Sequence, residues 1–536
     1  MNAQLLPLEQ ILSSGGDTRL ALDSKTGRNR YECLPRPGLA VPFGSCTSST
    51  VSRRGFEAAR DAHRVICSSA NPNDAAESCA NAIRQKLRAV LTLPDGVEVV
   101  LAPSGTDVEL LALALAAGSA DRPIVNIVVG PGEVGSGTPL AAACRHYDCL
   151  TPGGWQVVSG EPVDSALASL TDVRTVDLRS PGGDVLSEAE IDAAVIELVV
   201  EAIDANAVIL LHIVAHSKTG VHAPSLRCVE RLRQISDNVV VVVDAAQGRF
   251  SRRGLREVLQ KDYLVMFTGS KFYGGPPFSG ALLVPPGFQP AKRNVRRLPE
   301  GFGAYFSAAE MPKTWCEIRQ GLPVDQNLGS LLRWSAAIAE MEAYYKIPGN
   351  DRLRVLRYFE AEVPRILGAS RAIRMLPVFP PVYDDAAERL LESKTTVFGF
   401  WVTPPGARYP LGKADLKKIQ AELASDLSAN HPNADRFIMG HTFHVGQPVD
   451  LGLAGCVLRI ALGGELISRV AADTNLGESF DGRLAWLGGQ LQCLRQKIEC
   501  LAALRSPSAN ALSDGGVAVM ANLNILSSPL GPNVVT

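Results

Sequence analysis

The sequence has almost no excess charge of either sign and no long apolar run. Its 536 residues include 53 lysines and arginines and 55 aspartates and glutamates, a formal net charge of −2. Because basic residues do not outnumber acidic ones, we expect no nucleic-acid partner. No apolar stretch reaches the roughly 18 residues that a membrane-spanning helix needs, so we expect no membrane partner. The first residues, MNAQLLPLEQILSSGGD, lack a basic region followed by an apolar core, and secretion is not expected.

Paired cysteines are also missing. Eleven cysteines, an odd number, are scattered along the chain without a C-x-x-C pair, which argues against a disulfide framework. Cys144 and Cys149 are the closest two, and His146 alone does not complete a zinc site with them. His441 and His444 lie three residues apart but lack a third ligand nearby. We therefore expect no metal, and reduced thiols in a cytoplasmic protein.

Alternating segments in the middle of the chain predict the fold class. Strand-like and helix-like stretches follow one another, which is typical of a mainly parallel sheet with helices on both faces. Helices are predicted over 107–117 and 186–205, the second with a Ser-x-x-Glu capping box at Ser187 and Glu190. Apolar runs predict strands over 97–101, 124–129, 207–214, 239–243, 263–267 and 280–284.

The pattern changes after Pro285. The stretch 285–325 is rich in proline, glycine and arginine, and we predict irregular loops over the site. A long helix over 329–345 follows. It leads into a smaller α+β region with strands at 396–402 and 456–461 and an outer amphipathic helix at 486–504. The predicted parts are an N-terminal segment entering the site (1–90), a large domain (91–325), a connecting helix (326–350), a small C-terminal domain (351–505) and a flexible tail (506–536).

Two polar segments follow buried strands. The run 239–243 ends on Asp244, in Val-Asp-Ala-Ala-Gln, and the run 263–267 ends on Thr-Gly-Ser-Lys, which closes with Lys271. In an open α/β sheet such strand ends face one crevice. A carboxylate and an amine there can hold a pyridine ring by its nitrogen and its aldehyde by a Schiff base. The structural alternatives are an aspartate that caps a turn and a surface lysine.

On these residues the sequence resembles the pyridoxal-phosphate (PLP) enzymes of fold type I, and specifically the cysteine desulfurase-like aminotransferase class V group. The resemblance covers about 95–285 well and 440–465 in outline. It implies a PLP cofactor, an amino-acid substrate and a homodimer. It also implies that Lys271 is the catalytic Schiff-base lysine, that Asp244 binds the pyridinium nitrogen and that Gln247 donates to the phenolic oxygen.

A phosphate site is predicted at the start of the helix over 107–117. Ser104, Gly105 and Thr106 lie between a strand and that helix, where free N–H groups and the helix dipole favour an anion; a simple N-cap is the alternative. The resemblance matches this segment to the family's phosphate loop and adds hydroxyls after the later strand. In this family the neighbouring subunit also contacts the phosphate, and 326–330 is the segment expected to do so here. The hydroxyls after the later strand are those of Thr268 and Ser270. In the segment 326–330 the expected residue is Asn327.

Further site residues follow from the resemblance. Ser217, in His-Ser-Lys-Thr-Gly, falls on a position near the ring, and His216 is either a proton carrier or a residue with local hydrogen bonds. Arg459, in Leu-Arg-Ile, matches an arginine that anchors a substrate carboxylate through two parallel hydrogen bonds, with a structural ion pair as the alternative. His444 is close enough in sequence to meet the substrate side chain.

The segment 130–135 fits G-x-G-x-x-G, a dinucleotide fingerprint. An acidic residue should close a strand about 20 residues on, but Asp148 lies in a polar stretch. The resemblance instead puts this loop over the cofactor ring. Glu133 stands where many relatives have a stacking aromatic or histidine, so it is a candidate cofactor-binding residue.

Two absences bear on the reaction. Desulfurase relatives usually have His-Lys at the Schiff base, a stacking histidine and a reactive cysteine on a loop before the late arginine. Here serine precedes Lys271, no histidine occurs in 126–140, and only Cys456 lies near Arg459. We therefore predict an aminotransferase. The alternatives are a PLP-dependent lyase or desulfurase-like enzyme that cleaves a C–S bond, and a catalytically silent protein that kept the fold.

Overall fold

The computed structural model describes residues 6–119, 122–378, 389, 391–430 and 435–505. Its larger sheet has seven strands in the order β2-β8-β7-β6-β5-β3-β4, in which all pairs are parallel except those of β8. The strands are β2 (Glu98–Ala102), β3 (Ile124–Val129), β4 (Thr171–Val176), β5 (Val208–Val214), β6 (Val239–Ala245), β7 (Leu264–Thr268) and β8 (Gly280–Val284). All six strands predicted here are present, shifted by two residues at most.

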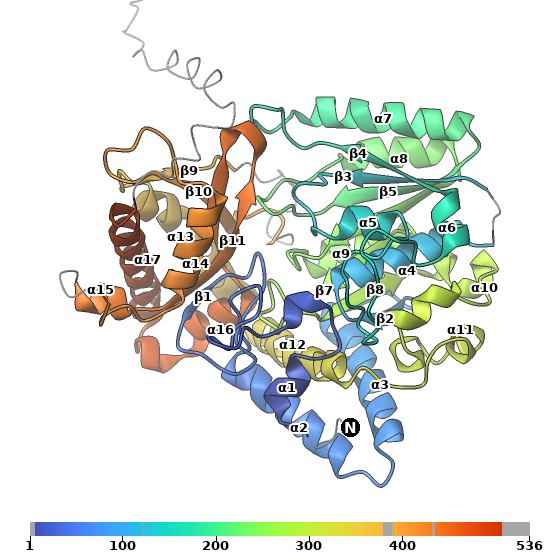
Figure 1. Cartoon of the computed structure of the whole chain (residues 1–536), viewed down its shortest axis with the longest axis horizontal. Helices are drawn as coiled ribbons and strands as arrows, with labels where there is room; N and C mark the ends of the chain where they lie inside the picture. The colour runs from blue at the N-terminus through green and yellow to red at the C-terminus, as the bar shows by residue number, and fades with distance from the viewer. Residues whose placement is uncertain (1–5, 120–121, 379–388, 390, 431–434, 506–536) are drawn as a thin grey trace, which may run out of the picture.

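Helices cover both faces of this sheet (Figure 1). On one face pack α7 (Glu188–Asp204), α8 (Leu226–Ile235) and α9 (Arg252–Gln260). The capping box of Ser187 and Glu190 at α7 is confirmed. On the other face lies α4 (Gly105–Ala117), which is mostly apolar and buried on all sides, as expected of a helix enclosed in a large core. The shorter α5 (Thr138–Ala142) contacts it, and α6 (Ser165–Leu170) precedes β4.

The smaller sheet has five strands in the order β1-β11-β12-β10-β9. Its strands are β1 (Val41–Phe43), β9 (Ile373–Met375), β10 (Val397–Val402), β11 (Phe443–Asp450) and β12 (Cys456–Ala461). The first strand comes from the N-terminal segment and pairs in parallel with β11. The helices of this part are α13 (Gly349–Leu367), α14 (Lys413–Leu423), α15 (Arg436–Gly440), α16 (Gly464–Ala472) and α17 (Phe480–Ala503).

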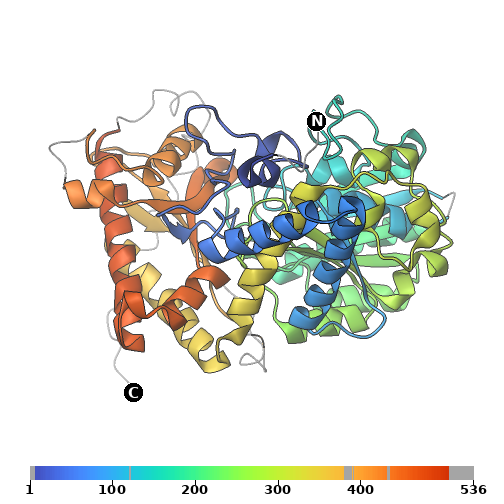
Figure 2. The ribbon, with the colours of Figure 1, turned by 90° about the horizontal axis from the view of Figure 1, so that it is seen from below.

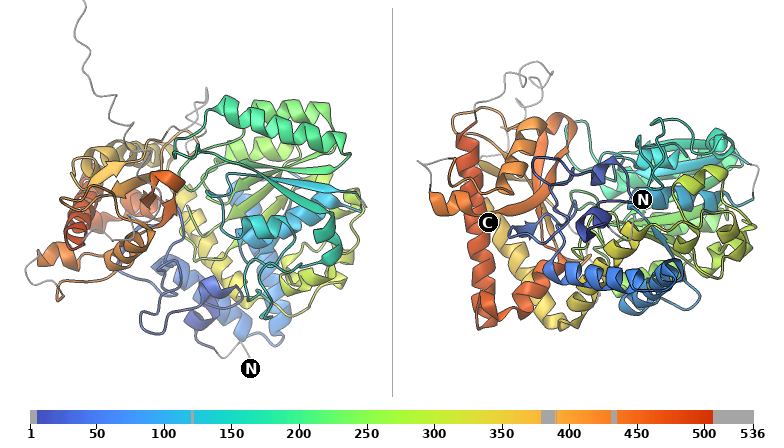
Figure 3. Two further views of the ribbon diagram at one scale, coloured as in Figure 1. Left: turned by 45° about the horizontal axis from the view of Figure 1, so that its top comes forward. Right: turned by 60° about the horizontal axis from the view of Figure 1, so that its bottom comes forward.

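One long helix, α12 (Leu328–Lys346), joins the two parts and runs between them in Figure 2. It packs against α2 (Arg53–Cys67), α3 (Pro72–Leu91), α16 and the short α1 (Leu8–Leu12). The right-hand view of Figure 3 shows the N-terminal segment lying between the two parts of the chain. The predicted tail, 506–536, lies outside the described residues.

The stretch 285–325 is less irregular than expected. It holds α10 (Pro290–Arg293), α11 (Cys316–Gln320) and three short 3-10 helices, η3 (Pro286–Phe288), η4 (Glu300–Ala304) and η5 (Ala308–Glu310). Its aromatic side chains, among them Phe302 and Trp315, are buried in the core on the α4 face. No described helix is long and apolar enough to span a membrane.

Candidate active site

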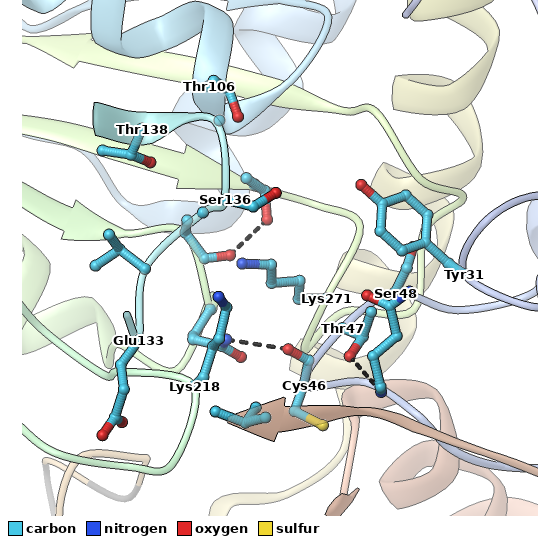
Figure 4. Close-up of a pocket in the computed structure, with 18 of the residues that line it drawn as sticks. Tyr31, Cys46, Thr47, Ser48, Thr106, Glu133, Ser136, Thr138, Lys218 and Lys271 are labelled. Carbon is cyan, nitrogen blue, oxygen red and sulfur yellow. Dashed lines mark hydrogen bonds between the residues drawn. The ribbon is translucent and has the colours of Figure 1, made fainter. Parts of the chain in front are cut away.

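A cavity of about 560 Å³ lies at the carboxyl ends of β5, β6 and β7, where open α/β sheets bind ligands. Its volume is in the usual range for small-molecule sites. Three parts of the chain wall it (Figure 4). The first is the loops of the large sheet with the start of α4. The second is the N-terminal segment, with Arg19, Arg30, Tyr31 and 46–48. The third is the small-sheet part, with β11, β12 and the first turns of α14. The segment 285–325 contributes no lining residue, so the expectation that it covers the site was wrong; its apolar side chains are buried against α4 instead.

Asp244 and Lys271 meet in this cavity because β6 and β7 are adjacent parallel strands. Asp244 lies near the end of β6 and accepts a hydrogen bond from Ala246 N at 3.0 Å. Burial lowers the pKa of Lys271, and the positive charges of Arg459 and Arg249 lower it further, against the opposing effect of Asp244. A lowered pKa increases the neutral fraction of the amine, which is the nucleophilic form.

The start of α4 faces the same space. Ser104 is the N-cap residue, and its Oγ accepts from Thr106 N at 3.2 Å and Asp107 N at 3.3 Å. Burial raises the pKa of Asp107 to about 6, and both its oxygens accept hydrogen bonds, from Ser104 Oγ and the Tyr147 hydroxyl. The helix end is thus rigidly built, and its first residues line the cavity.

Gly105, at the start of α4, lies within ordinary van der Waals distance of residues at the ends of β6 and β7. A Cβ there would lie 3.4 Å from Thr268 Cγ2 and 3.6 Å from Ala246 Cβ. The α4 start therefore abuts the ends of β6 and β7. Thr268 donates its hydroxyl to Ala246 O at 2.6 Å, and Thr268 and Ser270 line the cavity beside Thr106.

Gln247 links the large sheet to the N-terminal segment. Its Nε2 donates to Cys46 O at 3.0 Å, and it lines the cavity. Thr47 follows and accepts a hydrogen bond on Oγ1 from Gln447 N at 3.0 Å. The N-terminal segment thus forms one wall of the cavity and is held by both sheets.

Arg459 is buried on β12 and lines the cavity. Its Nε donates to Gln447 O at 2.9 Å, Nη1 to Lys218 O at 3.0 Å and Nη2 to Thr47 Oγ1 at 2.9 Å. These bonds use three of its five N–H groups and leave one on each Nη for other acceptors. It forms no ion pair within the described ranges, so the structural alternative, an ion pair, finds no support there.

Glu133 is bound to protein groups. Its Oε1 lies 2.5 Å from Arg179 Nε, and its Oε2 accepts from the hydroxyls of Ser217, at 2.6 Å, and Thr219. Burial raises the pKa of Glu133, but Arg179 and the two hydroxyls outweigh this, so the pKa is lowered. Figure 4 shows its carboxylate pointing away from Lys271. The carboxylate of Glu133 and the hydroxyl of Ser217 therefore connect two loops of the cavity wall.

Three predicted site residues are not among those that line the cavity. Ser217, expected near the ring, is one of them, and its hydroxyl is bound to Glu133. The other two are His444 and Asn327. His444 lies on β11 with Nε2 3.0 Å from Tyr31 O, and its Nδ1 faces the backbone of Gly44. Asn327 is the N-cap residue of α12 and donates to Gly15 O at 2.9 Å. Within one chain neither side chain reaches the space that Lys271 faces.

His216 lines the cavity with its ring against that of His222. Its Nδ1 lies 3.1 Å from Ser217 O and must carry the proton, because a carbonyl only accepts. Burial, with His222 and Arg249, lowers its pKa well below the ordinary value. His216 is therefore a neutral histidine with a local hydrogen bond. Of the two roles considered from the sequence, this one, and not that of a proton carrier, agrees with its surroundings.

Sequence reasoning did not assign several lining residues, among them Tyr31, Thr47, Lys218 and Gln447. Thr47 and Gln447 lie in polar segments, 44–50 and 441–447, whose composition is visible in the sequence. Lys218 follows Ser217, a predicted site residue, in the same loop. No local pattern marks Tyr31, because only the folded chain brings it to the cavity.

Comparisons with known proteins bear on the fold. No protein-family model and no curated protein matches the chain. Among solved structures, a NifS-like protein superposes with a TM-score of 0.50 at 14% identity, over 87% of this chain and 100% of that one. Others are mouse CSAD (0.49, 15% identity, 85% and 83% covered) and a ureidoglycine–glyoxylate aminotransferase from Bacillus subtilis (0.46, 12% identity, 87% and 98% covered). The similarity to the NifS-like protein confirms the expected fold type I architecture.

Proposed function

We propose that this chain binds pyridoxal 5'-phosphate and acts on an amino acid as an aminotransferase. The observation that carries the proposal is the convergence of Asp244 and Lys271 on one cavity, from the ends of adjacent parallel strands. The carboxylate of Asp244 suits a protonated pyridine nitrogen, and the amine of Lys271 suits an aldehyde. Arg459 faces the same cavity and retains two N–H groups for a carboxylate.

The donor set fits the phosphate of that cofactor. The first turn of α4 supplies a helix N-terminus, and the hydroxyls of Thr106 and Ser270 line the adjacent wall. Thr268 lies in the same wall, with its hydroxyl proton donated to Ala246 O. At Gly105 the first turn of α4 lies against the strand ends. Gln247 keeps one amide N–H beyond its bond to Cys46 O, which suits the phenolic oxygen. The fold family implies a homodimer. In such a dimer we propose that Asn327 of one subunit contacts the phosphate bound in the other subunit.

The roles of the chain's own residues follow from these positions. Bound PLP withdraws the electron pair left on the substrate α-carbon when a bond there breaks. Lys271 Nζ would move a proton between the substrate α-carbon and C4′ of the cofactor. The lowered pKa of Lys271 suits both the removal and the return of this proton. Arg459 holds the α-carboxylate and so fixes which substituent of the α-carbon faces Lys271.

The chain's cysteines support transamination over C–S cleavage. Cys456, near Arg459 in sequence, is buried outside the cavity lining, and burial raises its pKa to about 11, so its thiol is unreactive. Cys46 does line the cavity, but Figure 4 shows its sulfur directed away from Lys271. No other cysteine in the described ranges is among the lining residues.

The test is an assay of the PLP-loaded protein against a panel of amino acids with a 2-oxo acid as acceptor. We expect the 2-oxo acid of the donor and the amino acid of the acceptor to form in equal amounts. Release of sulfide or ammonia without transfer of the amino group would favour the lyase alternative. A protein that is purified colourless and takes up no added PLP would support the catalytically silent alternative.

A further inference from the structure

The cavity is lined by more positive than negative side chains. The positive residues are Arg19, Arg30, Lys218, Lys271, Lys413, Lys417 and Arg459, and the negative residues are Glu133, Asp244 and Asp450. Arg19 is neutralised by Asp17 at 2.5 Å, and Glu133 by Arg179, so neither adds to the field. The remaining excess is positive, and in a cavity walled by protein such an excess attracts anions.

The proposed function gives no role to several of the positive lining residues. Apart from Arg19, which Asp17 neutralises, Lys218 is the most buried of these. Its Nζ lies 3.3 Å from Gly132 O, and it forms no ion pair with any residue in the described part of the chain. Figure 4 shows its side chain extending from the wall toward Lys271. An ammonium in that position has spare N–H donors and no carboxylate to satisfy them.

The backbone of Lys218 is fixed relative to Arg459. Its N–H donates to Glu133 O at 2.8 Å, and its carbonyl accepts from Arg459 Nη1 at 3.0 Å. Glu133 is itself held by Arg179. The two positive groups therefore stand on one rigid assembly, as needed to recognise two anionic groups of one molecule at a set separation.

Further positive charge lies on α14. Lys413 and Lys417 are exposed, four residues apart, and therefore on the same face of the helix. Lys413 lies 3.8 Å from Asp450, whereas Lys417 has no ion pair with a described residue. Charges of this kind guide an anionic molecule toward a site and contribute less to its final binding.

We propose that the substrate's side chain carries a second anionic group, a carboxylate, sulfonate or phosphate, and that Lys218 binds this group while Arg459 binds the α-carboxylate. The inference rests on the proposed function and narrows its substrate class to acidic amino acids. Lys218 is then a specificity-determining residue. Lys413 and Lys417 raise the local concentration of the substrate at the entrance.

The charge of Lys218 depends on pH in the working range. Burial lowers its pKa to about 8, and Arg459 and Lys271 add to this, whereas Glu133 opposes it and Lys413 contributes a small further lowering. The ammonium is therefore present below pH 8 and lost above it. Preference for an acidic substrate should fall as the pH rises through 8, and Lys218→Arg should keep that preference to higher pH.

The experiment compares acidic amino acids with neutral partners on the PLP-loaded protein. Aspartate with asparagine and glutamate with glutamine are isosteric pairs, and cysteate and phosphoserine are each compared with serine. For at least one acidic member we expect kcat/KM to exceed that of its neutral partner by roughly 10- to 100-fold, the value of a charge-assisted hydrogen bond. Calorimetric titration with succinate and succinamate measures the same preference without turnover. Lys218→Met should bring the ratio close to one, and Lys313→Met, at an exposed site, should leave it unchanged.

The outcomes separate the two proposals. If neutral amino acids react as well as acidic ones, the acidic substrate class is wrong and the PLP function stands. If the acidic preference persists in Lys218→Met, the assignment of the second anionic group to Lys218 is wrong and the PLP function again stands. A response confined to cysteate or phosphoserine would assign the second group to a sulfonate or a phosphate. If the protein takes up no PLP, both proposals fall together.

Discussion

Arg249 Nη1 donates to Gln247 Oε1 at 3.1 Å, and this bond orients the amide of Gln247. A guanidinium only donates, so the atom it meets must be the amide oxygen. The amide nitrogen is then directed to Cys46 O and the cavity. The same guanidinium also donates to Gln247 O, Ser45 Oγ, Thr396 Oγ1 and Leu462 O, so one buried side chain joins the large sheet, the N-terminal segment and the small sheet.

Arg249→Lys should therefore destabilise the protein although it keeps the charge. An ammonium has three donors and no planar fork, so at least two buried acceptors lose their partners, at about 1–3 kcal/mol each. We expect a lower thermal unfolding midpoint and a weaker affinity for PLP. Arg227→Lys, at an exposed arginine, is the matched control and should change the unfolding free energy by less than about 0.5 kcal/mol. Equal effects of the two substitutions would contradict the role of Arg249.

Thr106→Val tests the proposed phosphate site. The substitution keeps the shape of the side chain and removes one hydroxyl from the start of α4. A hydrogen bond to a charged group contributes about 1.5–3 kcal/mol, so the dissociation constant for PLP, measured by fluorescence titration, should rise roughly 10- to 100-fold. Thr314→Val, at an exposed position outside the cavity, should leave it unchanged. An unchanged constant in Thr106→Val would place the phosphate elsewhere.

His212 and Glu109 form a buried pair inside the large domain, with His212 Nε2 3.2 Å from Glu109 Oε1. Burial lowers the pKa of His212, but the charge of Glu109 and its hydrogen bond outweigh this, so the pKa is raised. A raised folded-state pKa stabilises the protein fully below the unfolded pKa of about 6.5. That contribution is lost as the pH rises through the folded pKa.

Glu109→Gln should thus lower the free energy of unfolding more at pH 6 than at pH 9. The amide keeps the size of the side chain and removes the charge that favours protonated His212. Denaturant unfolding at the two pH values measures the difference, and His212→Gln should show the same trend. A destabilisation that is equal at both pH values would mean that His212 is neutral throughout and that the pair is an ordinary hydrogen bond.

Six of the seven strands of the large sheet could be predicted from the sequence because each is a short, mostly apolar run. Asp244 and Lys271 could be brought together for the same reason, since parallel neighbours in such a sheet end at one edge. The helix boundaries were also close, with α12 predicted over 329–345 and found over Leu328–Lys346. Local periodicity and capping were sufficient for these elements. The edge strand β4, which is polar and largely unburied, was not predicted.

The remaining features depend on contacts between distant residues. The ion pair of Glu133 with Arg179 spans 46 positions, and β1 joins a sheet whose other strands begin more than 300 residues later. The stretch 285–325 was expected over the site because its composition suggested loops, but its aromatic side chains are buried on the α4 face instead. No local pattern records which surface a segment will cover.

The most direct measurement of the central claim is to reduce the PLP-loaded protein with sodium borohydride, digest it and locate the pyridoxyl group by mass spectrometry. The account predicts the label on Lys271 and none on Lys218, the other enclosed lysine of the cavity. Lys271→Ala should abolish both the label and the visible absorption of the bound cofactor. A label on Lys218 or on any other lysine of the wild-type protein would contradict the account.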